Sequence, residues 1–316
     1  MWLANSINAV LLVFIVLAVG VFLNAKGWFD ETGENYLSKL LMYVVQPCII
    51  FSGVFGSFKL ELLKEIGPDI VYAFILPIVV FLAAFFLGKL IRLPQGQFGI
   101  AVSDFAFANI ASIGMPLCKM IYGEECLVYI TSFYVTSLVM YYLLAETLIA
   151  MDMEAGVDKK ATIIKQLKSP ITISVFLGII GGLSGITLPV FVMNSISTLG
   201  NCALAMILIM SGGIIYRAGW KSLVRWNKAR LFGTIGKMIL SPAITLCICL
   251  LLRMPAIAAA SYTTIAGMPS VTQPIITAKF YGADATTATE IYYSTTLLVL
   301  VMIPAFIAIV SALYGL

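Results

Sequence analysis

The chain has 316 residues, of which 61% are hydrophobic and 11% are charged, and its formal net charge is +4. A water-soluble domain is about 45–50% apolar and about 25% charged, so this composition excludes one and indicates an integral membrane protein. No histidine is present, which removes the usual general base and any Ser-His-Asp arrangement. We therefore expect no enzyme, no cofactor, no metal site and no nucleic-acid partner.

Apolar runs of about 20 residues, the length that a helix needs to cross a bilayer, recur along the chain. Barrel strands would instead give alternating segments of about ten residues. The first run is too long for a signal peptide and has no basic segment before it, so we interpret it as the first span. The prediction is an all-α integral membrane protein with ten transmembrane helices at 7–25, 36–58, 69–91, 98–121, 126–150, 170–188, 199–216, 230–252, 256–280 and 287–313.

The longest polar gap divides these spans five and five. We predict a first five-helix repeat at 1–150, a linker at 151–169 and a second repeat at 170–316. Fourteen Lys and Arg residues fall on the linker's side of the membrane and four on the other. Because cytoplasmic loops carry the cationic excess, we expect a multi-pass cell-membrane protein with a cytoplasmic linker and both termini on the extracytoplasmic side.

Two spans are interrupted by proline. The stretch 104–123 contains Pro116, and the stretch 266–282 contains Pro269 and Pro274. Each stretch ends in Tyr-Gly and is preceded by a similar motif, L-I-R-L-P at 90–94 and L-L-R-M-P at 251–255. With five helices in each half, equivalent helices cross the membrane in opposite directions, which predicts an inverted repeat. Paired, proline-interrupted segments in such repeats are the best sequence indication of a transporter's binding site.

A broken helix leaves backbone groups that lipid cannot satisfy, and a half-helix N-terminus favours an anion. Single proline kinks can merely help helices to pack, but two at matching positions favour a site. Gln46, in the second span, has the same two interpretations, close helix packing or a pocket wall. The predicted substrate-binding residues are Gln46, Asn109, Ser112, Pro116, Pro269, Ser270, Gln273 and Pro274.

Charged residues inside spans are functional candidates. Lys119, Glu146 and Glu290 lie near span ends, and we expect them to extend towards the membrane surface. Asp104 begins the fourth span, and Lys237 lies deep in the eighth with no partner in its own helix. Both are candidates for ion coupling, and Lys237 is expected to stabilise an anion or a carboxylate on another helix.

Four groups of residues carry a resemblance to a known family. They are Gln46–Phe51, Asn109–Pro116 with Tyr122-Gly123, Leu167–Pro170, and the pattern Met268-Pro269-x4-Pro274-x4-Lys279-x-Tyr281-Gly282. Together they resemble the auxin efflux carrier family, and the chain looks like a bacterial, PIN-like organic-anion permease. Where family members commonly have Leu or a similar residue before the proline of helix two, this chain has Gln46, which could alter substrate choice.

The resemblance implies that helices one, two, six and seven form a scaffold that often dimerises. Helices three to five and eight to ten would form a mobile transport unit, in which helices four and nine cross at their prolines beside the substrate. The expected function is secondary transport of a small organic anion, such as a mono- or dicarboxylate, by an elevator-type movement. The alternatives are a sodium-coupled organic-anion symporter, resembling the bile acid symporter family, and a ligand-binding membrane sensor without transport.

Overall fold

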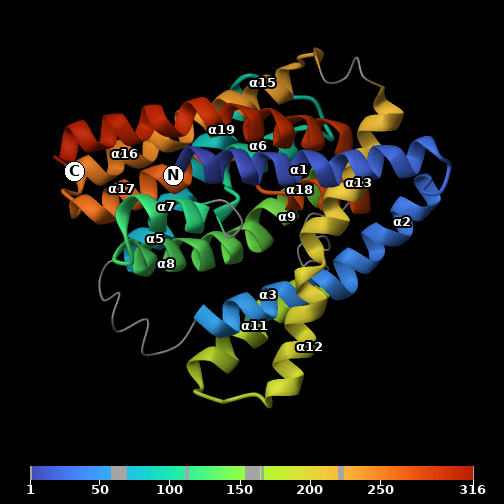
Figure 1. The fold of residues 1–316 in the computed structure, drawn as a ribbon, viewed down its shortest axis with the longest axis horizontal. Coiled ribbons are helices and arrows are strands. Elements are labelled where there is room, and N and C mark those ends of the chain that lie inside the picture. Colours follow the sequence, from blue (N-terminus) through green and yellow to red (C-terminus); the bar gives the residue numbers. More distant parts are fainter. Residues whose placement is uncertain are drawn as a thin grey trace.

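The computed structural model describes residues 2–57, 70–110, 114–153, 164, 167–219 and 224–315. Within these ranges every regular element is a helix, and the strand-like pairing is an isolated antiparallel bridge between Ala108 and Ser270. The predicted all-α class is therefore confirmed for the described part of the chain. Figure 1 shows how the helices are arranged.

The helices follow the predicted spans closely, and three of them contain a π-helical segment (η1, η4, η5). In chain order they are α1 (Trp2–Ala25), α2 (Glu31–Leu40), η1 (Leu41–Val45), α3 (Gln46–Ser57), α5 (Ile70–Leu90), α6 (Phe98–Ala106), α7 (Met115–Tyr122), α8 (Cys126–Met140), η4 (Tyr141–Ala145), α9 (Glu146–Met153), α11 (Pro170–Leu183), α12 (Val190–Asn201), α13 (Ala203–Ala218), α15 (Lys228–Ile235), η5 (Gly236–Leu240), α16 (Ser241–Leu251), α17 (Ala256–Ala266), α18 (Gln273–Tyr281) and α19 (Ala285–Tyr314).

Length and composition show which helices could span a membrane. Among the described residues, five continuous helices are long and apolar enough to cross a membrane, and a sixth if α19, bent by 48° at Pro304, is one span. The number ten stays a prediction, because α6–α7 and α17–α18 are broken and α11 is shorter. One predicted boundary is wrong: the helix expected at 199 begins at Val190. Its polar side chains bind their own backbone, as when Ser195 donates to the Phe191 carbonyl at 2.8 Å, so the polar residues do not stop the helix.

Two helix pairs pack closely along each other. α1 packs along α13, and α11 packs along α3, which also contacts α12. In Figure 1, α3, α11 and α12 lie together below the bundle that contains α5–α9 and α15–α19. Small residues allow the close approach of α1 and α13: a Cβ on Gly20 would collide with the Ile209 backbone, and one on Gly212 with the Leu17 carbonyl. Such contacts are typical of helices that pack within a membrane.

The two Leu-x-Arg-x-Pro motifs fold in the same way. Arg92 and Arg253 both have left-handed backbone conformations, with φ of 53° and 50°, which are uncommon for residues other than glycine. In each motif the following residue donates its N–H to the carbonyl five residues earlier, at 3.3 Å for Leu93 and 3.0 Å for Met254. This is a Schellman-type helix end. The two halves therefore share a local structure as well as a sequence pattern.

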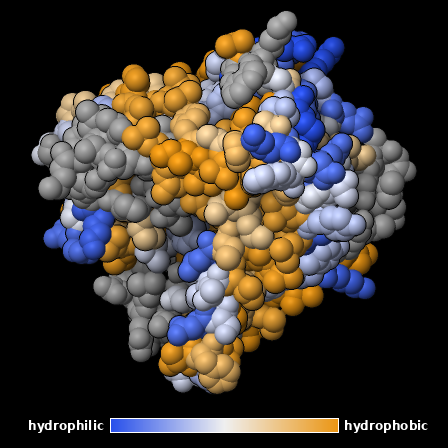
Figure 2. Space-filling view, turned by 45° about the vertical axis from the view of Figure 1, so that its right-hand side comes forward, coloured by the Kyte–Doolittle hydropathy of each residue, from blue (hydrophilic) through white to orange (hydrophobic). Residues whose placement is uncertain are grey.

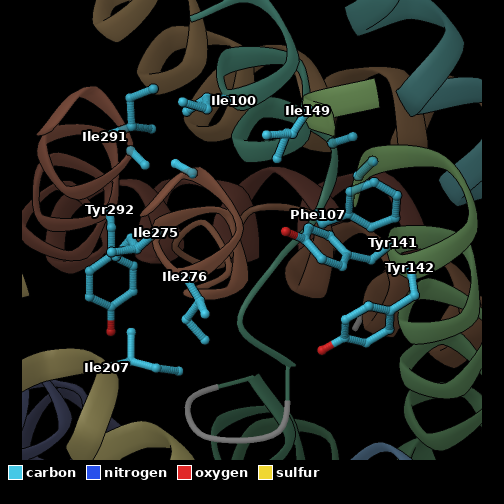
Figure 3. Close-up of a cluster of buried hydrophobic side chains, with 14 of the residues drawn as sticks. Ile100, Phe107, Tyr141, Tyr142, Ile149, Ile207, Ile275, Ile276, Ile291 and Tyr292 are labelled. Carbon is cyan, nitrogen blue, oxygen red and sulfur yellow. The ribbon is translucent and has the colours of Figure 1, made fainter. Parts of the chain in front are cut away.

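The apolar core surrounds the broken helices. Buried side chains from α6, α9, α18 and α19 converge there, among them Ile100, Ile149, Ile275 and Ile291 (Figure 3). The outer surface also carries many exposed large hydrophobic side chains, and Figure 2 shows broad hydrophobic areas on it. A surface of this kind suits contact with lipid.

Candidate functional site: the crossing of two broken helices

The two broken helices meet backbone to backbone. α6 ends at Ala106, and the chain becomes extended at Phe107, with φ −104° and ψ 142°. The Asn109 N–H donates to the Pro269 carbonyl at 2.8 Å, and the Val271 N–H donates to the Phe107 carbonyl at 3.3 Å. These bonds satisfy groups that neither helix can satisfy alone, at a depth where lipid offers no partner.

Proline sets where the second half of each helix begins. Pro116 lies in the first turn of α7, and Pro274 lies in the first turn of α18. The first turn tolerates proline because its backbone N–H groups have no partner within the helix. Consequently both half-helices start anew after the crossing, and Thr272 and Gln273, at the start of α18, are placed at the crossing itself.

A cavity with about 90 Å³ of water-accessible space lies against this crossing. A water molecule needs roughly 10–15 Å³ of such space, so the cavity is large enough for several waters or for a small solute in their place. In Figure 3 the Tyr142 hydroxyl points towards the first broken segment, beside Phe107 and Tyr141. The wall is made of Gln46, Ile49, Phe107, Ala108, Asn109, Ile110, Tyr134, Ser137, Leu138, Tyr141, Tyr142, Ala203, Leu204, Ile207, Val271, Thr272 and Gln273.

The described wall is mostly apolar, includes several polar side chains and carries no charged one. Tyr142 donates to the Gln46 Oε1 at 2.8 Å, which leaves the NH2 group of that amide to donate elsewhere. The Gln273 Oε1 is buried and has no hydrogen-bond partner among the described residues. Asn109 adds a third amide and is 8% exposed. The cavity therefore offers several neutral hydrogen-bonding groups around the first turn of α18.

The structure brings together three of the predicted site residues, Gln46, Asn109 and Gln273, in the wall of one cavity. Ser270 lies beside this cavity. Its N–H donates to the Thr295 hydroxyl at 3.1 Å, and its hydroxyl is hydrogen-bonded to the same oxygen at 3.2 Å. Their role in binding stays a prediction. Pro269 and Pro274 are buried at the crossing and Pro116 begins α7, whereas Ser112 lies outside the described residues.

Sequence reasoning missed the aromatic part of the wall. Tyr134, Tyr141 and Tyr142 line the cavity, and the last two begin the π-helical segment η4. Such segments are frequent at functional sites, but hydropathy does not reveal them. The signal that could have found these residues is the repetition of tyrosine along an otherwise apolar span.

The ion-coupling candidates lie together, away from the cavity wall. Asp104 in α6 and Lys237 in η5 are both fully buried, and η5 packs against α6. The side chain of Lys119 is exposed and paired with Glu124 at 2.7 Å, as expected. The expectation that Glu146 and Glu290 reach the surface is wrong, because they are 0% and 5% exposed. Their helices face neighbouring helices there instead of lipid.

An ionic cluster around the buried Glu34, which the sequence did not reveal, joins three helices. Glu34 of α2 is fully buried and accepts from Arg217 of α13 at 2.6 Å. Lys279 of α18 lies 3.6 Å from the second oxygen of Glu34 and 3.3 Å from Glu31. The cluster therefore ties the second broken helix to α2 and α13.

The sequence matches the family described as membrane transport protein over residues 5–307. The chain belongs to this family. The match confirms the resemblance to the auxin efflux carriers. An uncharacterized transporter of Methanocaldococcus jannaschii is 25% identical over 309 residues, which cover 93% of this chain and 96% of the relative. An uncharacterized transporter of Schizosaccharomyces pombe is 30% identical over 104 residues, 33% of this chain and 23% of the relative.

Proposed function

We propose that this membrane transport protein is a secondary transporter of a small organic anion, such as a mono- or dicarboxylate, which binds in the cavity at the helix crossing. One observation carries the proposal: the first turn of α18 and the amides of Gln46, Asn109 and Gln273 line a single uncharged cavity. Half-helix N-termini of this kind bind the anionic groups of substrates in inverted-repeat transporters.

The chemistry of the wall favours an anion over a cation. The N-terminus of α18 carries partial positive charge, and amide and hydroxyl groups can donate to carboxylate oxygens. The described wall includes no carboxylate to attract a cation. The aromatic and aliphatic remainder suits the carbon skeleton of a small acid.

The proposed architecture has ten transmembrane helices in two inverted repeats, with helices one, two, six and seven as scaffold. The packing of α1 on α13 and of α11 on α3 supports this division, because each pair joins the first helix of one proposed repeat to the second helix of the other. The matching helix ends at Arg92 and Arg253 also support it. Both units contribute to the cavity, since Ile49, Ala203 and Ile207 come from scaffold helices and Asn109 and Gln273 from the crossing. Sliding the transport unit past the scaffold would therefore open the crossing to alternate sides.

The protein's setting follows from the same architecture. We place it in the cell membrane, with both termini outside and the linker in the cytoplasm, as the cationic excess requires. A homodimer through the scaffold helices is supported by the exposed apolar side chains of α11, which include Ile173, Phe176, Leu177 and Ile180.

A thermal-shift screen against mono- and dicarboxylates, with and without sodium and at several pH values, tests the substrate class, because a ligand that binds the folded state raises its Tm. Radiolabelled anions that raise the Tm are then offered to proteoliposomes. We expect saturable uptake without sodium. Uptake that requires sodium favours the sodium-coupled symporter, and saturable binding without flux favours the sensor. A screen in which no carboxylate raises the Tm contradicts the proposal.

A further inference from the structure

The Lys237 ammonium is held at the end of a half-helix beside a buried carboxylate. Lys237 in η5 and Asp104 in α6 are each 0% exposed. The Lys237 Nζ donates to the carbonyl of Ala106, the last residue of α6, at 3.5 Å. Asp104 lies in the last turn of α6, two residues before Ala106, and α6 packs against η5.

Close packing of η5 on α6 makes this arrangement possible. A Cβ on Gly236 would collide with the Phe105 ring, so only glycine allows the two elements to approach this closely. Lys237 follows directly and is buried with Gly236 and Met238. The π-helical turn lies immediately before Ser241 and Pro242, where the helix is already interrupted. Lys237 is therefore held against the last turn of α6 with no route to the membrane surface.

The surroundings of the ammonium form a site for a monovalent cation. The C-terminal end of α6 carries partial negative charge, and the Asp104 carboxyl group lies in the same last turn. Neither Asp104 oxygen has a hydrogen bond among the described residues, although the Ser270 and Tyr141 hydroxyls lie close enough to interact electrostatically. In inverted-repeat transporters, the C-terminal ends of half-helices and unwound carbonyls coordinate sodium. Here a lysine side chain takes that place.

We propose that Asp104 and the C-terminal end of α6 form a monovalent-cation site that the Lys237 ammonium occupies permanently, in place of a dissolved coupling ion. The site is separate from the anion cavity, since neither residue lines it. What this site means for ion coupling rests on the proposed function. Because the Lys237 ammonium fills the cation site as part of the protein, the anion crosses the membrane without a dissolved sodium ion. Removing the ammonium should therefore create a sodium requirement.

The Lys237→Met variant tests the site, because methionine keeps most of the side-chain length and removes the charge. Tm is measured for the purified protein in sodium chloride and in choline chloride at equal ionic strength, without any organic anion. The parent should unfold at the same temperature in both salts. Lys237→Met should lose several degrees in choline and recover part of the loss as sodium is added, with a saturable dependence. The double variant Lys237→Met/Asp104→Asn should be insensitive to sodium again.

Each other outcome overturns the proposal. It fails if Lys237→Met has the same Tm in both salts, or if sodium stabilises the parent. A Lys237→Met protein that cannot be folded even in sodium also contradicts it, because sodium then fails to replace the ammonium. The Tm measurement involves no anion, so it stands even if no carboxylate binds. Anion uptake into proteoliposomes is measured as a separate experiment. Uptake by Lys237→Met should require sodium, and uptake by the parent should not.

Discussion

Replacing Tyr142 by phenylalanine removes one hydroxyl from the cavity wall and leaves the ring in place. In the parent this hydroxyl donates to the Gln46 Oε1 at 2.8 Å, and both side chains are buried. Loss of the donor leaves the Gln46 oxygen unsatisfied, which should cost about 1–3 kcal/mol of stability. The amide is then free to rotate, and re-orienting it on binding should cost about 1 kcal/mol, or about fivefold in the Kd of the anion.

Thermal unfolding and equilibrium binding of a radiolabelled carboxylate measure the two effects separately. Tyr36→Phe is the matched control, because Tyr36 lies in α2 and its side chain is 68% exposed, so neither Tm nor Kd should change. A double-mutant cycle with Gln46→Ala isolates the coupling between the two residues. If Tyr142→Phe binds the anion as tightly as the parent, or if the two substitutions are additive in binding, the hydroxyl does not orient Gln46 for the substrate.

Three further predictions concern residues outside the cavity wall. Lys279→Met removes one of the cations beside the buried Glu34 and should weaken the packing of α18 on α2 by about 1 kcal/mol; unchanged amide hydrogen exchange in α18 would argue against such a link. Gly212→Leu should cost more than about 3 kcal/mol, because its side chain collides with the backbone of α1. Gly56→Ala is its control, because no atom lies within 4 Å of the added Cβ. Thermal unfolding measures the Tm of both variants. Arg253→Gly should raise or preserve Tm, because glycine adopts the left-handed backbone conformation of this residue, with φ of 50°, without the strain of up to about 1 kcal/mol that a side chain causes there. A clear fall in Tm would show that the arginine side chain stabilises this turn.

The breaks in the two helices could be predicted because proline has a strong local effect. Pro116 and Pro274 each begin a half-helix, and the repeated motifs that precede them predicted that the two segments are related. Their contact could not be derived from either segment alone. It depends on the pairing of Ala108 with Ser270, which lie 162 positions apart (270 − 108) in the sequence.

Burial of charge was the weakest part of the prediction, because hydropathy gives the depth of a residue in a span but not the face on which it lies. Glu146 and Glu290 were expected near the surface, yet they face other helices. No sequence pattern indicated Glu34, which is fully buried between Arg217 and Lys279. These three residues come from distant parts of the chain, so no local pattern joins them.

The most direct test of anion binding at the crossing is Asn109→Ala. Alanine keeps the backbone bond from residue 109 to the Pro269 carbonyl, 2.8 Å long in the parent, so the crossing should survive while the cavity loses one amide. Asn201→Ala makes the same chemical change at an exposed position in α12. Loss of a hydrogen bond to a charged ligand costs about 1.5–3 kcal/mol, or about ten- to a hundredfold in Kd. We predict that Asn109→Ala folds but binds the carboxylate that much more weakly, while Asn201→Ala binds like the parent. Equal binding by Asn109→Ala and the parent would contradict an anion site at the helix crossing.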